Sequence, residues 1–274
     1  MNVTRSPKSC DCVQDFGPRW FGGVCTGLRQ RRVRPNHRAS SFAWTEAFDT
    51  ALLHAAKVGG FELAGVAEVK RLTGFPRELN GCNRPSIDLR GNAGGGLAFL
   101  RVMSYLTPER IPVGHSVTRA RAESGYTKES LATFDRIPSQ KAALILLALK
   151  FGFRDDSVNI VTEGLGAKPF HGRTAVLVDE TTTGAGERIA AFAQERQLAP
   201  IVGTQTAGRL ICCSVYKIGH GYYVRIPARA WYTWRGELLE GTGVRPDCRI
   251  EDGKEYTSDV ALERAMSVVQ GLHS

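Results

Sequence analysis

The chain has 274 residues, of which 42% are hydrophobic and 23% charged, and a chain of this length can bury a core that needs neither disulfides nor a metal for stability. Its formal net charge is +9, but no recognised nucleic-acid module with interleaved aromatic and basic residues accompanies it, so no nucleic-acid partner is expected. No stretch is apolar over enough residues to span a bilayer and none has the form of a cleavable signal peptide, which favours a cytoplasmic protein without a membrane partner.

Residues 1–40 are expected to form an irregular basic extension. They contain eight Arg and Lys residues against two Asp, and they are rich in Cys and Pro without helical or strand periodicity, as a divergent leader or a misassigned start would be. We therefore expect an α/β core over residues 41–274, supported by motifs from about residue 86.

The first elements of the core are predicted from hydrophobic spacing. Apolar residues recur at helical spacing from about residue 41 until Gly59–Gly60, which predicts an amphipathic helix, and a second helix is expected over 62–72. Residues 86–89 form a short apolar strand that the loop GNAGGG ends, and a helix follows over 97–105. Between 115 and 168 the pattern predicts only one helix, at 139–153, among polar segments that it does not assign.

The order of elements is clearer in the second half. TAVLVDE (174–180) and PIVGTQ (200–205) read as strands on either side of a helix at 181–197, which predicts a right-handed crossover with parallel strands. Two strand-like runs at 210–218 and 221–234 are joined by Gly219–His220–Gly221, which favours a hairpin, and a last helix is expected over 258–272. The continuous apolar runs at 87–89, 175–178 and 201–202 predict neighbouring, buried, parallel strands.

The seven cysteines have no repeated Cys-x-x-Cys spacing, and their number is odd. Both features argue against a disulfide framework and against a zinc site. Cys212 and Cys213 are predicted to be reduced, to lie in a strand and to be at least partly buried.

Two glycine-rich segments, GNAGGG after Leu89 and TTTGAGE after Val178, each follow a strand and precede a helix. Unencumbered backbone N–H groups at such places can hold a phosphate or form an oxyanion hole. A dinucleotide site or P-loop is disfavoured, because neither segment has the required Gly-x-Gly-x-x-Gly or Gly-Lys-Ser/Thr pattern.

Four segments together resemble one family of enzymes. IDLRGNAGG, VLVDETTTGAGE, VGTQTAGR and EGTGVRPD are similar, in this order, to the signatures of the tail-specific, or C-terminal processing, serine peptidases. The resemblance covers about residues 86–270. It implies a crotonase-like or ClpP-like α/β core with a tricorn-like catalytic centre, peptide or polypeptide substrates, possible oligomers and no metal or organic cofactor.

The resemblance also implies which residues occupy the catalytic positions. Counting back from Glu187 puts the nucleophilic serine position at Gly184, and the ungapped spacing puts the family's lysine position at Arg209. The oxyanion hole is expected from the N–H of Ala185 with that of Gly94 or Gly95. Glycine has no side chain with which to attack, and arginine is a poor general base, so the serine–lysine dyad is absent in this register.

Alternatives remain open for the nucleophile and its base. A shifted register would make Thr183 a fallback nucleophile. His115, His171 and His220 are candidate bases by residue type alone, and each is by default a solvent-exposed or locally bonded histidine. Glu240 could orient a base or cap a loop, and Asp88 with Arg90 is expected to brace the glycine loop.

The sequence therefore supports a serine-type peptidase by family, with the degenerate dyad leaving its own activity in doubt. The alternative is a non-catalytic, peptide-binding pseudo-peptidase, and a more distant one is an acyl-CoA enzyme with a related core. The family's PDZ-like module is not recognisable in the roughly 85 residues before the first motif, so an N-terminal lobe could be missing.

Overall fold

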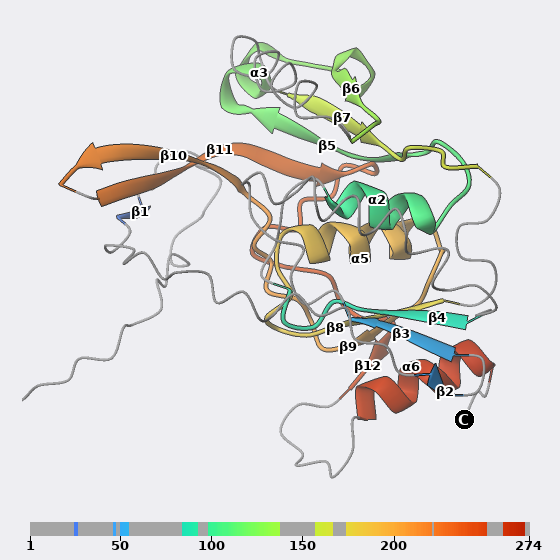
Figure 1. Cartoon of the computed structure of the whole chain (residues 1–274). Coiled ribbons are helices and arrows are strands. Elements are labelled where there is room, and N and C mark those ends of the chain that lie inside the picture. Colours follow the sequence, from blue (N-terminus) through green and yellow to red (C-terminus); the bar gives the residue numbers. More distant parts are fainter. Residues whose placement is uncertain are drawn as a thin grey trace, which may run out of the picture.

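The computed structural model describes residues 84–92, 98–137, 157–166, 174–220, 222–250 and 260–271, and short strands at 25–26, 46–47 and 50–54. Within this part of the chain, two sheets enclose a layer of helices (Figure 1). One helix covers the outer face of the lower sheet. The fold is thus a mixed α/β architecture with a largely parallel lower sheet.

The lower sheet carries the predicted parallel strands. Its order is β12-β9-β8-β4-β3-β2. Four of these strands run parallel to one another: β9 (Ile201–Gly203), β8 (Ala175–Val178), β4 (Arg84–Asp88) and β3 (Thr50–His54). β12 (Cys248–Arg249) is also parallel, whereas β2 (Glu46–Ala47) is antiparallel to β3. The expectation that 87–89, 175–178 and 201–202 form neighbouring, buried, parallel strands is confirmed.

The helix predicted from about residue 41 to Gly59–Gly60 is wrong where the structure describes it, because β2 and β3 occupy 46–47 and 50–54. A short run of alanine and leucine fits a helix face and a sheet position equally well. Here the pairing of β3 with β4 decides the outcome. The helices expected over 62–72 and 139–153 lie outside the described residues.

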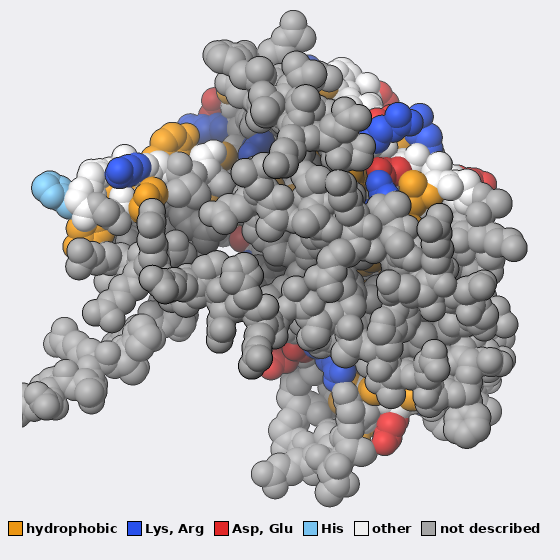
Figure 2. Space-filling view, viewed as in Figure 1, with side chains coloured by type: hydrophobic (Ala, Val, Ile, Leu, Met, Phe, Trp, Pro, Cys, Tyr) orange, Lys and Arg blue, Asp and Glu red, His pale blue; other side chains and the backbone are white. Residues whose placement is uncertain are grey.

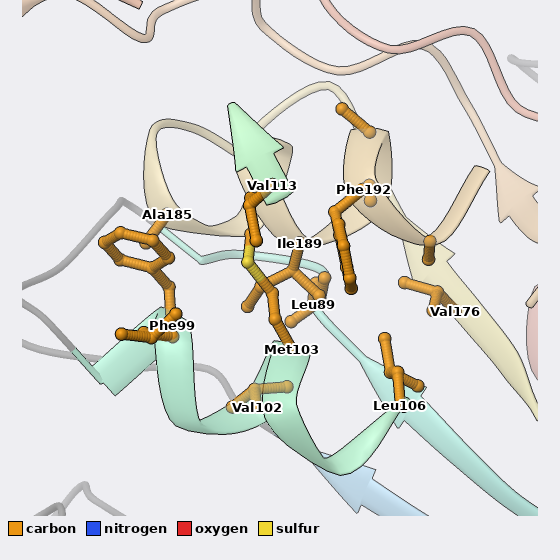
Figure 3. Close-up of a cluster of buried hydrophobic side chains, with 14 of the residues drawn as sticks. Leu89, Phe99, Val102, Met103, Leu106, Val113, Val176, Ala185, Ile189 and Phe192 are labelled. Atoms are coloured by element: carbon orange, nitrogen blue, oxygen red, sulfur yellow. The ribbon is translucent and has the colours of Figure 1, made fainter. Parts of the chain in front are cut away.

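Helices α2 (Ala98–Tyr105) and α5 (Ala185–Glu195) were both predicted from the sequence. They pack together between the two sheets. Figure 3 shows their apolar faces meeting: Phe99 and Met103 of α2 lie near Ile189 and Phe192 of α5, above Val176 of β8. All five side chains are buried. This cluster fixes α5 against the carboxyl ends of β4 and β8.

The opposite face of the lower sheet is covered by the predicted last helix, α6 (Val260–Gln270). Ala175 and Leu177 point to α6, whereas their neighbours Val176 and Val178 belong to the cluster between the sheets. Because both faces are buried, the strand is apolar at every position instead of alternating.

The upper sheet has the order β1-β11-β5-β7-β6 with β10 paired to β11. Its strands are β1 (Cys25–Thr26), β5 (Pro112–Thr118), β6 (Ala132–Phe134), β7 (Val158–Val161), β10 (Cys212–Gly219) and β11 (Tyr222–Thr233), with α3 (Arg119–Ser124) and the 3-10 turn η1 (Lys128–Ser130) between β5 and β6. The sequence left β5, β6 and β7 unassigned. It did predict the antiparallel hairpin of β10 and β11, whose turn has positive φ at Gly219 (101°) and His220 (47°).

Cys212 and Cys213 both lie in β10 and both are free thiols, as expected. The expectation of burial is wrong for Cys213, which is exposed, whereas Cys212 is half-buried. A register shift between the two residues marks where the strand leaves the body of the protein for the hairpin.

Candidate active site

The predicted nucleophile position, Gly184, is the N-cap of α5. Its backbone has φ 53° and ψ −101°, a left-handed conformation that an L side chain rarely adopts, so glycine fits this position without strain. The Gly184 N–H donates to the carbonyl oxygen of Arg209 at 3.1 Å and to Glu187 Oε2 at 2.9 Å. The two positions that the sequence predicts for the catalytic dyad are therefore in direct backbone contact.

Glu187 joins the two positions from the interior of the protein. Its side chain is fully buried, and besides Gly184 it accepts hydrogen bonds from Thr206 Oγ1 (2.7 Å), from the Gly208 N–H (2.5 Å) and from the Arg209 N–H (2.9 Å). One carboxylate thus links the start of α5 to the segment TAGR. This role of Glu187 was not predicted, although a Glu three residues after an N-cap is the known capping pattern.

The loop that carries Thr183 lies against the first glycine-rich segment. The Thr183 N–H donates to the Asn92 carbonyl oxygen at 2.8 Å, and Thr183 Oγ1 is 3.4 Å from the same oxygen. A Cβ built on Gly186 would be 3.4 Å from Cβ of Asn92, so α5 begins in contact with this loop. Gly94 and Gly95 lie outside the described residues, so their expected part in an oxyanion hole stays a prediction.

Ala185 is the first residue of α5 and is buried. Its N–H has no acceptor among the described residues, as is usual for the first donors of a helix. It therefore remains a backbone donor at the positive end of the helix dipole, beside Gly184.

The segment after Arg209 is held by Glu240. Glu240 Oε2 accepts hydrogen bonds from the Leu210 N–H (2.6 Å) and the Ile211 N–H (2.8 Å). Burial raises the pKa of the Glu240 carboxyl above its ordinary value, while these two bonds oppose the shift. The geometry is that of a carboxylate that caps a loop.

The segments TQTAGR and EGTGVRPD pair with each other, which explains why both motifs occur. The Val244 N–H donates to Thr206 Oγ1 at 2.8 Å, and the Thr206 N–H donates to the Val244 carbonyl at 3.1 Å. The Gly241 N–H donates to the Gly208 carbonyl at 2.8 Å. Glu240 and Glu187 therefore brace the Arg209 segment from two sides, while the Arg209 side chain is exposed.

The expected ion pair of Asp88 with Arg90 is present, with Arg90 Nη2 2.8 Å from Asp88 Oδ2. The Arg90 N–H also donates to Asp88 Oδ1, at 3.0 Å. A second set of bonds, which the sequence did not predict, also holds this loop. Asp179 Oδ2 accepts from the Gly91 N–H at 3.0 Å, and the Thr182 hydroxyl donates to the Leu89 carbonyl oxygen at 3.0 Å. The end of β8 thereby fixes the start of the first glycine-rich loop.

The candidate histidines do not meet at this centre in the described structure. His115 is buried on β5, where Nε2 is 3.2 Å from the Tyr126 hydroxyl and the ring stacks on Tyr232. Burial lowers the pKa of His115, and Lys128 adds to the effect. His220 is exposed at the hairpin turn, and His171 lies outside the described residues.

The described ranges of the chain contain no group of three or more His, Cys, Asp and Glu side chains arranged to hold a metal ion. They also contain no helix with the length and apolar character needed to cross a bilayer.

Comparison with known proteins identifies relatives that are similar to this chain in sequence. The chain is 29% identical over 76 residues to the carboxy-terminal-processing protease of Bartonella bacilliformis, and 24% identical over 230 residues to tricorn protease homolog 2 of Streptomyces coelicolor. These matches cover 28% and 80% of this chain, but only 18% and 15% of the respective relatives.

Solved structures show the same fold. The photosystem II D1 C-terminal processing protease superposes with a TM-score of 0.51 at 19% identity, over 80% of this chain and 46% of that protein. The model of peptidase family S41 matches residues 58–250, which includes all four motifs and every described residue of the centre around Gly184. By this match, the chain belongs to peptidase family S41.

Proposed function

We propose that this chain binds polypeptide as a member of the tail-specific serine peptidases and does not itself hydrolyse the peptide bond. The observation that supports this is the 3.1 Å hydrogen bond from the Gly184 N–H to the Arg209 carbonyl. It brings the nucleophile and lysine positions of the family together with neither a nucleophile nor a suitable base. A crotonase-like or ClpP-like core is part of the same proposal.

The side chains at the two positions support the loss of chemistry. Glycine offers no hydroxyl, and the guanidinium of the exposed Arg209 is a poor general base where a lysine could serve. The peptide-bond chemistry of this family needs a hydroxyl that a base deprotonates as it attacks. Without both groups the first step has no reactant on the protein.

The surrounding frame supports retained binding of a carbonyl group. The Ala185 N–H stands at the N-terminus of α5 without an internal acceptor in the described residues, where a substrate carbonyl oxygen could receive it. Glu187 and Glu240 hold the Arg209 segment in place at the same centre. The names of the relatives, a carboxy-terminal-processing protease and a tricorn protease homolog, point to polypeptide as the ligand.

The test compares the unmodified chain with a Gly184→Ser/Arg209→Lys variant on an unstructured polypeptide. We expect no cleavage by the unmodified chain. The double variant should gain measurable cleavage, though limited, because a serine at φ 53° is strained by about 1–3 kcal/mol. Gly184→Ala/Arg209→Lys is the matched control, since it carries the same strain and the same lysine without a hydroxyl. Cleavage by the unmodified chain at a rate above this control would contradict the proposal.

One observation favours a second candidate, an active peptidase that uses Thr183. Its hydroxyl is half-buried beside Asn92 and makes only a long contact of 3.4 Å to the carbonyl there. Thr183→Ala separates the two functions. If the unmodified chain cleaves polypeptide and this variant does not, threonine is the nucleophile.

A further inference from the structure

The hairpin arm, defined as residues 212–226 of β10 and β11, exposes most of the large apolar side chains that are open to solvent. Within the described residues six such side chains are exposed, and five of them lie on this arm, the other being Leu165. The five are Tyr216 (53% exposed), Ile218 (61%), Tyr222 (45%), Tyr223 (48%) and Ile226 (37%). In Figure 2 the arm extends from the body with hydrophobic and basic side chains along it.

Four of the five apolar side chains lie on one face of the arm, and Tyr223, which pairs with Lys217, lies on the other. Tyr216 pairs with Val224, and Ser214 pairs with Ile226, so Tyr216 and Ile226 share a face. Strand alternation adds Ile218 and Tyr222 to it. Such a one-sided apolar face on a protruding two-stranded ribbon is a typical docking surface.

The arm also has a free sheet edge. β11 is flanked on one side by β10 and on the other by β1 and β5, whereas β10 pairs with β11 alone among the described strands. A strand at the edge of a sheet presents N–H and C=O groups to which an extended chain can pair. The occupant that fits such an edge is polypeptide in an extended conformation.

The charge of this region restricts that occupant further. From Cys212 to Ile226 the arm contains two basic residues, Lys217 and Arg225, and no Asp or Glu. Lys217, near the end of β10, is exposed. A second copy of the arm would bring like charges together, whereas an acidic segment would be attracted.

The arm leads directly to the candidate active site. Leu210 and Ile211, which Glu240 holds, immediately precede β10, and the Arg209 carbonyl contacts Gly184. A segment antiparallel to β10 would run from the hairpin turn toward these residues, a distance of about 25 Å for eight residues. Its carboxyl end would arrive at the centre.

We propose that the hairpin arm binds an extended polypeptide segment with alternating apolar and acidic residues, added as a strand along β10. This rests on the proposed polypeptide-binding function and specifies its substrate class and its site. Apolar side chains of the segment lie over Tyr216 and Ile218, and its acidic side chains lie on the other face, beside Lys217. The backbone bonds supply affinity that does not depend on cleavage.

The experiment measures binding of a fluorescent peptide to the full chain by anisotropy. The probe has the length of β10, eight residues, with alternating valine and glutamate. A second probe carries N-methyl groups on alternate amides, which keeps the charge and side chains but removes the donors for strand pairing. The protein variants are Tyr216→Ser/Ile218→Ser and, as a matched control away from the arm, Leu165→Ser, which also removes an exposed apolar side chain.

The expected result is that the plain probe binds, that Tyr216→Ser/Ile218→Ser weakens binding about tenfold or more, and that Leu165→Ser changes it less than about twofold. The N-methylated probe should bind at least about tenfold more weakly. Equal binding of the two probes, or unchanged binding by the arm variant, would overturn the proposal while leaving polypeptide binding elsewhere intact. Failure of every peptide to bind would overturn both proposals. The same holds if the full chain binds no peptide but sediments with phosphatidylserine vesicles, or forms a dimer through the arm.

Discussion

Two buried polar side chains, Glu187 at the start of α5 and His115 in the upper sheet, differ sharply in their partners. Glu187 accepts four hydrogen bonds from the candidate active site, which leaves its carboxylate well supplied with donors. Among the described residues, His115 has one polar contact, to Tyr126, and its Nδ1 has no hydrogen-bond partner. Asn159, which pairs with His115 across β5 and β7, likewise has no partner for its Oδ1 in this part of the chain.

The comparison shows that burial alone does not measure the importance of a polar group. The Glu187 carboxylate takes the place of water for four donors, three of which are backbone N–H groups. These donors have few other acceptors. The histidine is held mainly by its ring, stacked on Tyr232 at 5.2 Å. Stability should therefore depend strongly on Glu187 and weakly on His115, although both are more than nine-tenths buried.

The largest expected effect is that of Glu187→Ala. Removal of the carboxylate leaves Thr206 Oγ1 and the N–H groups of Gly184, Gly208 and Arg209 without this acceptor. We expect the free energy of unfolding to fall by about 4 kcal/mol, measured by urea denaturation. Glu180→Ala is the control, because Glu180 is exposed and bonds only to Thr204 Oγ1 in the described structure. Equal losses in both variants would show that Glu187 does not act as a structural acceptor.

Two glycines of the motif EGTGVRPD test how tightly this motif packs against the segment TQTAGR. Gly243 has φ 66°, and a Cβ there would be 2.3 Å from the Thr206 carbonyl oxygen. Gly241 has φ 78° and open space around it. Both alanine variants should lose about 1 kcal/mol of the free energy of unfolding, because alanine is strained at positive φ. Gly243→Ala should lose about 2 kcal/mol more because of the close contact, and thermal unfolding measures the difference. A Gly241→Ala variant that is equally unstable would remove the packing explanation.

The parts of the fold that the sequence predicted are those with one dominant signal. Val176 and Leu177 are apolar on both faces of β8, so the strand has a continuous apolar run. β5 was missed because its buried positions include His115 and Ser116, which break such a run. β3 was mistaken for a helix because Ala51 and Leu52 suit both structures, and only the partner strand decides.

The candidate active site also contains residues that the sequence indicated and residues that it did not. Gly184 and Arg209 could be placed from the spacing of four motifs, and the structure brings them into contact. The supporting residues Asp179 and Asn92 were not recognised, because their roles depend on which backbone groups the fold brings near them. A capping pattern could have indicated Glu187, but its bonds to the Arg209 segment cross 21 and 22 residues of sequence and carry no local signal.

A smaller effect is expected at His115. His115→Phe keeps the stacked ring and removes a single bond to a partly exposed Tyr126, so the free energy of unfolding should change by less than about 1 kcal/mol at neutral pH. Because burial lowers the pKa of His115, the native state resists protonation, and the unmodified protein should lose stability as the pH falls below 6.5. The variant should lose less over that range. A large loss at neutral pH would erase the contrast with Glu187.

The smallest effect concerns the pH dependence that Glu240 adds to the frame. Burial raises its pKa above the ordinary value of 4.5, and the nearby Glu187 carboxylate adds to the shift. The native state therefore keeps the proton more readily than the unfolded chain, so this group contributes stability below pH 4.5 that is lost as the pH rises through its raised pKa.

Glu240→Gln has no such proton to lose, and its stability should fall less than that of the unmodified protein as the pH rises from 4.5 toward neutrality. The amide oxygen can still accept from the Leu210 and Ile211 N–H groups, so the loop stays capped. Urea denaturation over a pH series measures the difference, and Glu237→Gln, at an exposed position three residues earlier, is the matched control. If the two variants have the same pH profile, burial does not raise the pKa of the Glu240 carboxyl, and Glu240 adds no pH dependence to the stability of the protein.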